Sequence, residues 1–298
     1  MKYDPIFERF KGFSGVKPAG QVVDFLGVFC DEEMLEPGKP LSPEQHIPGV
    51  GPLNCTGDGY FDLIAVLRSV EEAKERFVMI ELGAGYGYWI SQGALAARQR
   101  GLPFHLTGVE AEPTHYDMML RHLRNNGVDP ADHTILHAAV TMKGGEAWFQ
   151  TGKPHEWWGQ EVIAHPESYT PPENSGLTQV RAVSLPELLA PHERVDLVHM
   201  DVQGLERDVL GSALEVMNAK VRRVIVGTHS EWIEGSVREL MAGWVKEFDF
   251  PMSQTHQTVY GPVSFGDGVQ IYSNPALGAP YVEKAPARRL FGLLPPKR

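Results

Sequence analysis

Cysteine and positive charge are scarce in this chain of 298 residues. Its two cysteines, Cys30 and Cys55, form no CxxC pair and are too few for a disulfide framework, so a reducing compartment is the simpler expectation. The formal net charge is −11. This balance argues against a nucleic-acid substrate, because binding to a phosphate backbone needs basic surface.

Long apolar runs are missing as well. No stretch of 18 consecutive apolar residues occurs, and residues 1–13 contain no run of signal-peptide length. We therefore expect a soluble, cytoplasmic protein without a transmembrane segment. Hydrophobic residues make up 42% of the chain and charged residues 22%, which is typical of a globular protein with a sizeable core.

Three alternating glycines follow a strand-like apolar run in the stretch FVMIELGAGYGYW, residues 77–89. A helix-like segment, 89–100, comes next. Glycines let a backbone approach a ligand closely, and a helix start offers unpaired N–H groups to polar ligand atoms. The dinucleotide fingerprint G-x-G-x-x-G is absent, because Tyr88 stands where its third glycine would be. The stretch therefore predicts a nucleotide-like ligand other than a dinucleotide.

The rest of the chain alternates strand-like and helix-like segments, which predicts a doubly wound α/β sheet. Strands are expected at 77–82, 104–109, 133–140, 195–200, 221–226, 255–260 and 269–272. Helices are expected at 60–76, 89–100, about 114–125, 206–219 and 236–248, with capping-box spacing at Thr114–Asp117 and Ser184–Glu187.

Three segments stand apart from this alternation. Residues 1–57 are an irregular extension, with a short strand expected at 22–29, and could form one wall of a pocket beside the main domain, 58–280. Residues 151–179 are expected to be a lid-like insertion or a surface flap. Residues 281–298 form a basic tail that is either loosely docked or makes weak peripheral contact with an anionic membrane.

An acidic residue, Glu110, ends the second predicted strand, about one βαβ unit after the glycine loop. A carboxylate at this place suits a ribose, because its two oxygens accept hydrogen bonds from both hydroxyls. The alternative is an acid in a loop that faces solvent.

Four motifs together resemble the FkbM-type methyltransferases, which use S-adenosylmethionine. They are E-L-G-A-G-Y-G at 81–87, V-E-A-E-P at 109–113, L-H-A-A-V at 136–140, and D-V-Q-G-L-E with a following V-L pair at 201–210. Gln203 departs from the usual glutamate of the last motif. The resemblance covers roughly residues 77–275.

This resemblance implies a mostly parallel, seven-stranded sheet of the class I methyltransferase (Rossmann-like) type. It also implies methyl transfer to a hydroxyl of a small molecule or glycan, such as a sugar or polyketide-like acceptor. The resemblance also implies roles for the matching residues of this chain. The methionine pocket is shaped by Glu81, Gly83 and Gly85, the ribose is held by Glu110, and the adenine lies against Ala138 and Ala139. The expected cofactor-binding set is completed by Ala84, Tyr86 and Ala111.

A hydroxyl is a weak nucleophile at neutral pH, and a base beside it would accelerate transfer by about 10² to 10⁴. His229, just beyond the strand 221–226, is a candidate because its ordinary pKa lies near operating pH. Asp201, one strand over, could orient His229, accept the proton itself or bind a divalent cation such as magnesium. His199 lies two residues before Asp201 and could join either scheme.

The residues expected to contact the acceptor are Gln203, Trp157 and Trp158. Two other functions stay open: N-methylation or another S-adenosylmethionine-type group transfer, and a non-catalytic cofactor-binding module. The missing N/D-P-P-Y motif after strand 195–200 weighs against an amide or nucleobase nitrogen as the target. The sequence leaves open the identity of the acceptor, the need for a metal and the oligomeric state.

Overall fold

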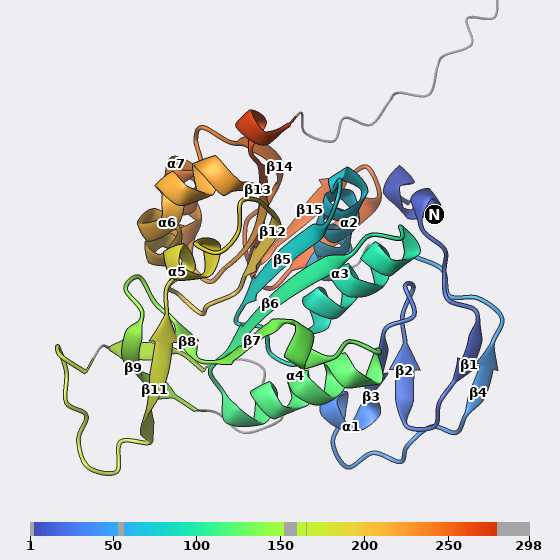
Figure 1. Cartoon of the computed structure of the whole chain (residues 1–298), viewed down its shortest axis with the longest axis horizontal. Coiled ribbons are helices and arrows are strands. Elements are labelled where there is room, and N and C mark those ends of the chain that lie inside the picture. The colour runs from blue at the N-terminus through green and yellow to red at the C-terminus, as the bar shows by residue number, and fades with distance from the viewer. Residues whose placement is uncertain (1–2, 53–56, 152–159, 165, 279–298) are drawn as a thin grey trace, which may run out of the picture.

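Seven strands form the central sheet of the computed structural model, which describes residues 3–52, 57–151, 160–164 and 166–278 (Figure 1). Their order across the sheet is β14-β17-β13-β12-β5-β6-β7. The strands are β5 (Phe77–Leu82), β6 (Phe104–Glu110), β7 (Thr134–His137), β12 (Val195–Met200), β13 (Val221–Thr228), β14 (Val245–Phe250) and β17 (Gly268–Ser273). The predicted doubly wound α/β sheet is confirmed.

The topology of the sheet determines where a ligand binds. The chain moves outward from β5 through β6 to β7 and then returns to β12 on the other side of β5. All of these strands are parallel, and β17 alone runs antiparallel to its neighbours β13 and β14. The place where the strand order reverses in this way is called the switch point, and here it lies between β5 and β12. In open α/β sheets, ligands bind at the switch point, beyond the carboxyl ends of the strands.

Helices cover both faces of the sheet (Figure 1). One face carries α2 (Asp58–Glu72), α3 (Tyr88–Gln99) and α4 (Pro113–Asn125), and the other carries α5 (Leu185–Leu189), α6 (Glu206–Lys220) and α7 (Glu231–Leu240). The residues of β5 alternate between the two cores: Phe77 and Met79 pack with α2 and α3, whereas Val78 and Ile80 pack with α6 and α7. Burial on both faces explains the unbroken apolar run of this strand.

The extension before α2 packs against α3 and α4 instead of forming a separate domain. It contains η1 (Pro5–Arg9), β1 (Gly15–Lys17), β2 (Gln21–Val23), β3 (Phe29–Asp31), α1 (Glu32–Leu35) and β4 (Gln45–Ile47). The single strand predicted at 22–29 is wrong. The chain turns at Asp24 and Gly27, where the amide of Gly27, at φ 88°, donates to the carbonyl of Asp24, so β2 and β3 form a hairpin.

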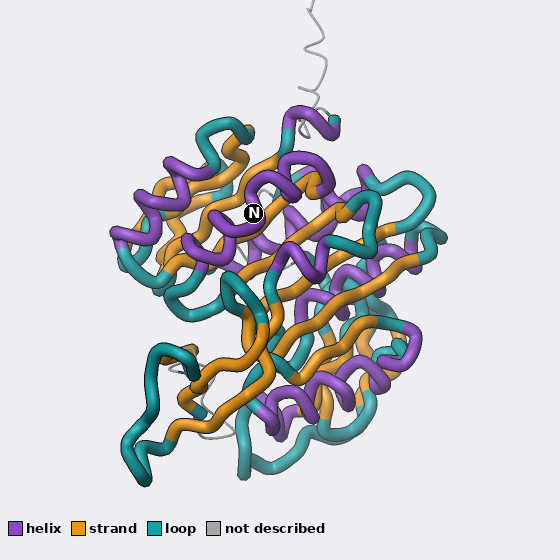
Figure 2. Tube along the Cα trace, turned by 60° about the vertical axis from the view of Figure 1, so that its left-hand side comes forward, coloured by secondary structure: helices purple, strands orange, loops and turns teal. Residues whose placement is uncertain are grey.

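A second, four-stranded sheet stands to one side of the body (Figure 2). It consists of β8 (Ala139–Val140), β9 (Gly145–Gln150), β10 (Val162–Ala164) and β11 (Leu177–Val183). The predicted strand 133–140 is therefore two strands, because β8 leaves the central sheet to pair with β11. The insertion 151–179 has strands near both of its ends, and Trp157 and Trp158 lie outside the described residues.

The carboxyl-terminal third differs from the prediction in two places. The helix expected over 236–248 begins earlier, where the hydroxyl of Ser230 accepts from the amide of Ile233, and ends at Leu240. The strand β14 follows it. The strand predicted at 255–260 is β15 (Gln254–Thr258), which pairs with β16 (Gly261–Phe265) as a separate hairpin. The basic tail, 281–298, lies outside the described residues, and none of the described helices is long and apolar enough to cross a membrane.

Candidate functional site

A cavity opens at the carboxyl ends of β5, β6 and β12, between the glycine loop and the four-stranded sheet. Its position is the one that the switch point predicts. It is lined by Gly83, Gly85, Val109, Glu110, Ala111, His115, Ala138, Ala139, Val140, Phe149, Gln160, Glu161, Val162, Asp201, Val202 and Gln203.

The glycine loop passes directly against the end of β12. Gly83 has φ 73°, and a Cβ added to it would lie 1.8 Å from the carbonyl oxygen of Asp201. The amide of Asp201 in turn donates to the carbonyl of Leu82 at 2.9 Å. No side chain fits at position 83, so the close approach of the loop to β12 requires glycine there.

Two buried glutamates support this loop from below. Glu81 accepts a hydrogen bond from the amide of Ile90 at 3.0 Å and so fixes the start of α3. Glu110 accepts from the amide of Gly85 at 2.7 Å and from that of Glu112 at 2.7 Å. Burial raises the pKa of Glu81 and the pKa of Glu110 to about 7 in each case. Glu110 lines the cavity, whereas Glu81 lies beneath it.

Most of the expected cofactor-binding residues do meet at the cavity. Those that line it are Gly83, Gly85, Glu110, Ala111, Ala138 and Ala139. Glu81, Ala84 and Tyr86 do not line it. The ring of Tyr86 faces His122, 5.2 Å away between ring centres, on the side of the loop covered by the extension. None of the described residues of the extension, 3–52, lines the cavity.

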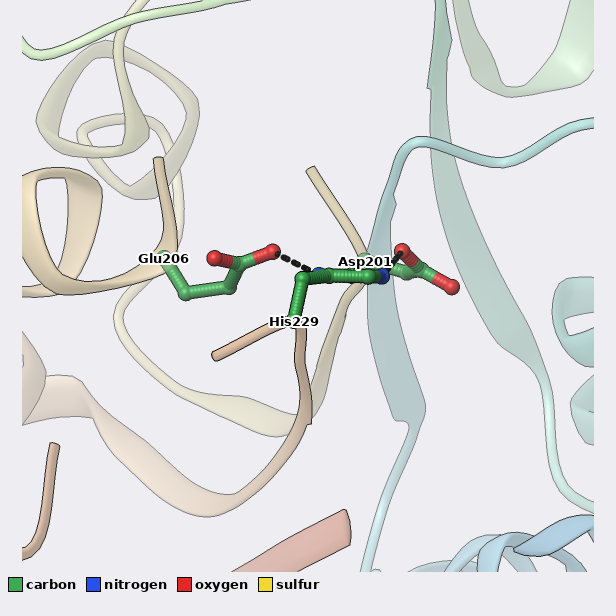
Figure 3. Close-up of side chains that lie close together, drawn as sticks. All are labelled: Asp201, Glu206 and His229. Atoms are coloured by element: carbon green, nitrogen blue, oxygen red, sulfur yellow. Dashed lines mark hydrogen bonds and ion pairs between the residues drawn. The ribbon is translucent and has the colours of Figure 1, made fainter. Parts of the chain in front are cut away.

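Beside the glycine loop, just past the end of β12, lies a hydrogen-bonded chain of acid, imidazole and acid (Figure 3). His229 lies between two carboxylates: its Nε2 is 3.2 Å from Oδ1 of Asp201, and its Nδ1 is 2.8 Å from Oε1 of Glu206. Nε2 of Gln203 donates to Oδ1 of Asp201 at 2.9 Å and lies 2.9 Å from Nε2 of His229. Glu206 is completely buried, whereas 43% of the Asp201 side chain is exposed at the cavity.

The charges of this chain follow from its contacts. Burial alone would lower the pKa of His229, but hydrogen bonds to Asp201 and Glu206 outweigh burial and raise it to about 10. Burial alone would raise the pKa of Asp201, but the contact with His229 lowers it below its usual range. At neutral pH His229 is therefore an imidazolium, and its two ring nitrogens face Asp201 and Glu206.

His199 belongs to a different cluster. It is buried, its Nε2 lies 3.7 Å from Oδ2 of Asp62 on α2, and its ring lies 5.5 Å from that of Trp89. Strand alternation turns His199 toward α2 and α3, whereas Asp201 lies past the end of the strand. The structure thus brings together Asp201, Gln203 and His229 and places His199 beneath the glycine loop.

The hydrogen-bonded residues Asp201, His229 and Glu206 are also the candidate ligands for magnesium. Asp201, Glu206 and His229 each offer one ligand atom, and these atoms lie within 4.8 Å of one another, the single such group among the described residues. The two carboxylates, however, sit on opposite sides of the imidazole, and each faces one ring nitrogen (Figure 3). Magnesium prefers a shell of oxygen ligands. The geometry fits a shared proton better than this metal.

Sequence reasoning gave no role to several residues of the site. Glu206 lies in the D-V-Q-G-L-E motif at a predicted helix start, and this position was the one feature of the sequence that could have indicated a role for it. His115 follows the helix cap Glu112, whose carboxylate accepts from the amide of His115 at 2.7 Å; the cap predicted at Thr114 is therefore wrong. Phe149 and Val162 reach the cavity from the four-stranded sheet, and nothing in their sequence pattern indicated it.

Comparisons with known proteins agree with this arrangement. The methyltransferase FkbM domain family matches residues 81–251. A candidate methyltransferase of Jannaschia sp. (strain CCS1) is 29% identical over 281 residues, which cover 91% of this chain and 99% of that protein.

Solved structures with a similar chain path include two methyltransferases. Methyltransferase FkbM from Methylobacillus flagellatus KT has a TM-score of 0.42 at 9% identity, covering 74% of this chain and 56% of that one. Precorrin-6y C5,15-methyltransferase from Geobacter metallireducens GS-15 has a TM-score of 0.41 at 10% identity, covering 71% of this chain and 86% of that one.

Proposed function

The chain belongs to the FkbM methyltransferase domain family, and from that premise we propose that it methylates a hydroxyl of a small molecule or glycan. Its fold is of the class I methyltransferase type, and its family implies S-adenosylmethionine as the methyl donor. The observation that carries the proposal for a hydroxyl is the Asp201–His229–Glu206 chain, which reaches the cavity through Asp201 beside the glycine loop.

The residues of the cavity fit this donor. Glu110 offers its carboxylate to the ribose hydroxyls, and Ala138 and Ala139 leave flat space for the adenine. Gly83 and Gly85 line the cavity without side chains, so the methionine end can approach the backbone of the loop closely. When bound there, the donor supplies a methyl group on a positively charged sulfur, which is already a good leaving group.

Asp201 is the residue placed to receive the acceptor. Its carboxylate is exposed at the cavity and is held in one orientation by Gln203 and His229. A hydroxyl hydrogen-bonded to Asp201 gains electron density on its oxygen, and its proton passes to this carboxylate as the new O–C bond forms. Solvent then takes the proton. Glu206 is a positioning residue: it does not reach the acceptor, and it fixes the ring of His229 through Nδ1.

We assign the whole of residues 58–280 to one methyltransferase domain. The four-stranded sheet covers the cavity with Phe149 and Val162, so this sheet supplies part of the wall against which an acceptor would lie. The extension before residue 58 does not line the cavity with its described residues. It supports the glycine loop from the other side through its contacts with α3 and α4.

The kind of acceptor can be tested with a donor that carries a deuterated methyl group. Matched panels of hydroxyl, amine and thiol compounds, including sugars and phenols, would be incubated with the protein and analysed by mass spectrometry. We expect the label on oxygen. Label found on nitrogen with no hydroxyl product would contradict the proposal and favour the N-methyltransferase alternative.

Removal of metal ions gives a second prediction. Because the two N–H groups of the His229 imidazolium already join it to both carboxylates, turnover should survive dialysis against EDTA within about twofold. Initial rates before and after dialysis, with and without added magnesium, measure this. Loss of turnover that magnesium restores would show that the cluster holds a metal ion in the active protein.

A further inference from the structure

A second set of buried acids surrounds an imidazole beneath the glycine loop. Glu81 and His199 are register partners on β5 and β12, so their side chains lie next to each other on the face of the sheet that α2 and α3 cover. Asp62 of α2 approaches His199 to 3.7 Å, and the amide of Ile90 donates to Glu81. Asp62, His199 and Glu81 are each less than 10% exposed. We call these three residues the Asp62–His199–Glu81 set.

The set lies under one end of the cavity. Along the carboxyl edge of the sheet, β12, β5, β6 and β7 lead in turn to Asp201, Gly83, Glu110 and Ala138, all of which line the cavity. Neighbouring strands are about 4.8 Å apart, so these four positions span about 14 Å. With its ribose at Glu110 and its adenine at Ala138, a bound donor has its methionine end and sulfonium near Gly83 and Asp201. Glu81 and His199 come two residues before these positions.

The charges at this end are predominantly negative. The set has two carboxyl groups to one imidazole, as does the Asp201–His229–Glu206 chain beside it. Among the described residues, no lysine or arginine lines the cavity, whereas Glu110, Glu161 and Asp201 do. Buried charges are little screened by salt, so their field acts on a ligand in the cavity.

We propose that the Asp62–His199–Glu81 set distinguishes the methyl donor from its product by charge. The inference rests on the proposed use of S-adenosylmethionine. Transfer of the methyl group converts the sulfonium cation into the neutral thioether of S-adenosylhomocysteine, while the acceptor loses a proton. Both nucleosides share the ribose, the adenine and the amino-acid group. The set stabilises only the cation, so the product is bound more weakly and leaves.

The charge of the set changes near neutral pH. Burial raises the pKa of Glu81 to about 7, and His199 partly offsets that rise. The ionisable groups that interact with Glu81 are His199 from β12, Glu110 from β6 and Tyr86 of the glycine loop. Asp62 and Asp201 act on Glu81 through His199. An increase from pH 6 to pH 8 ionises Glu81 and makes the set more negative. Preference for the donor over the product should therefore rise across this range.

The test is the ratio of the two dissociation constants, product over donor, measured by calorimetry. Glu81→Gln removes the charge and leaves an amide oxygen that still accepts from Ile90. We expect this variant to lower the ratio on the order of tenfold, because it removes one buried unit charge near the cation at an effective dielectric of about 20 to 40. Asp196→Asn is the matched control, because Asp196 is a buried acid at the far end of β12 that accepts from the amide of Val78.

Thermal unfolding establishes that both variants are folded. The same ratio of dissociation constants, measured on the wild-type protein at a series of pH values, tests the inference without any substitution. The expected result is a ratio that rises from pH 6 to pH 8 in the wild type and in Asp196→Asn, with a smaller rise in Glu81→Gln. Glu110, whose pKa is also about 7, contributes to all three proteins, so the difference between them isolates Glu81. Equal ratios in the wild type and Glu81→Gln, together with a flat wild-type series, would overturn the inference. If neither nucleoside binds the wild type, the proposed function fails and this inference fails with it.

Discussion

At the scale of single residues, the histidine between two carboxylates makes stability depend on pH. Folding raises the pKa of His229 from an ordinary value of about 6.5 to about 10, so the native state favours the protonated ring. The stability from this proton is complete below pH 6.5 and is lost as the pH rises through 10.

We therefore expect His229→Gln to lower the free energy of unfolding by about 3 kcal/mol at pH 6.5 and by much less at pH 10.5. Urea unfolding of both proteins at the two pH values measures this difference. An equal loss at both values would show that His229 is not held as a cation in the folded protein.

Gln203 gives a second test of the same ring. Its amide can donate to Nε2 of His229 when the ring is neutral, whereas a carboxylate at this position could only accept. Gln203→Glu should raise the pKa of His229 further, and it should lower kcat at pH 7 by about tenfold because Asp201 loses the amide donor that orients it. The exposed Gln254→Glu on β15 is the control for an added charge. A pH–rate profile identical to that of the wild type would contradict the role given to Gln203.

The sequence indicated part of this site for a clear physical reason. Asp201 and His229 follow neighbouring parallel strands, and the carboxyl ends of such strands meet at one edge of the sheet. The contact of Glu206 could not be predicted, because it depends on how the turn at Gly204, with φ 105°, directs the start of α6 back toward β13. The expected partnership of Asp201 with His199 assumed strand alternation beyond Met200, where the strand has already ended.

At the scale of elements, the glycine loop has the least room for change. In Gly83→Ala the new Cβ would meet the backbone oxygen of Asp201, which cannot move without separating β5 from β12. We expect a loss of several kcal/mol in the free energy of unfolding and loss of donor binding. Gly101→Ala is the control, because φ there is also positive, 66°, but the added Cβ meets nothing within 4 Å. It should cost only about 1 kcal/mol.

Urea unfolding and calorimetry with S-adenosylmethionine compare the two glycine variants. If Gly83→Ala were no less stable than Gly101→Ala and still bound the donor, the close approach of the loop to β12 would be wrong.

Elements with a single strong signal were predicted well. The runs at 77–82 and 195–200 are mostly apolar because both faces of each strand are buried, and the structure places both strands at these bounds. The capping box of Ser184 and Glu187 is also confirmed. The split of 133–140 had no such signal, because β8 is defined by a partner, β11, more than 40 residues later in the chain. The mixed sequence VKEFDF likewise becomes β14 only because it pairs with β17.

At the scale of the whole molecule, buried ion pairs join the extension to the sheet at some distance from the cavity. Arg223 of β13 is completely buried between Glu72 and Glu247, and Arg68 of α2 pairs with Glu247 and Asp4. Removal of one partner leaves a buried charge with too few counter-charges. Glu247→Gln should therefore lower the free energy of unfolding by about 3 to 5 kcal/mol.

The exposed pair of Lys39 and Glu36 is the control, since Lys39→Ala should cost less than about 1 kcal/mol. Chemical unfolding measures both losses, and donor binding by the folded Glu247→Gln protein should be unchanged. A loss in Glu247→Gln as small as that in Lys39→Ala would show that the network contributes little.

The position of the extension was the least predictable feature at this scale. Its strands are too short to show a repeating pattern of apolar residues. Its contacts are made with residues much later in the chain: Asp24 accepts from the hydroxyl of Tyr88, and the amide of Phe29 donates to the side chain of Asn126. These contacts place the described part of the extension behind the glycine loop, and none of its described residues lines the cavity.

The central claim is that Asp201 takes part in catalysis and does not hold the methyl donor. The most direct measurement is made on Asp201→Ala, with the dissociation constant of S-adenosylmethionine from calorimetry and turnover measured on the same sample. We predict a dissociation constant within about threefold of the wild-type value and turnover reduced at least about 100-fold, since a positioned base contributes about 10² to 10⁴. Turnover that survives the substitution, or donor binding that disappears with it, would contradict the account.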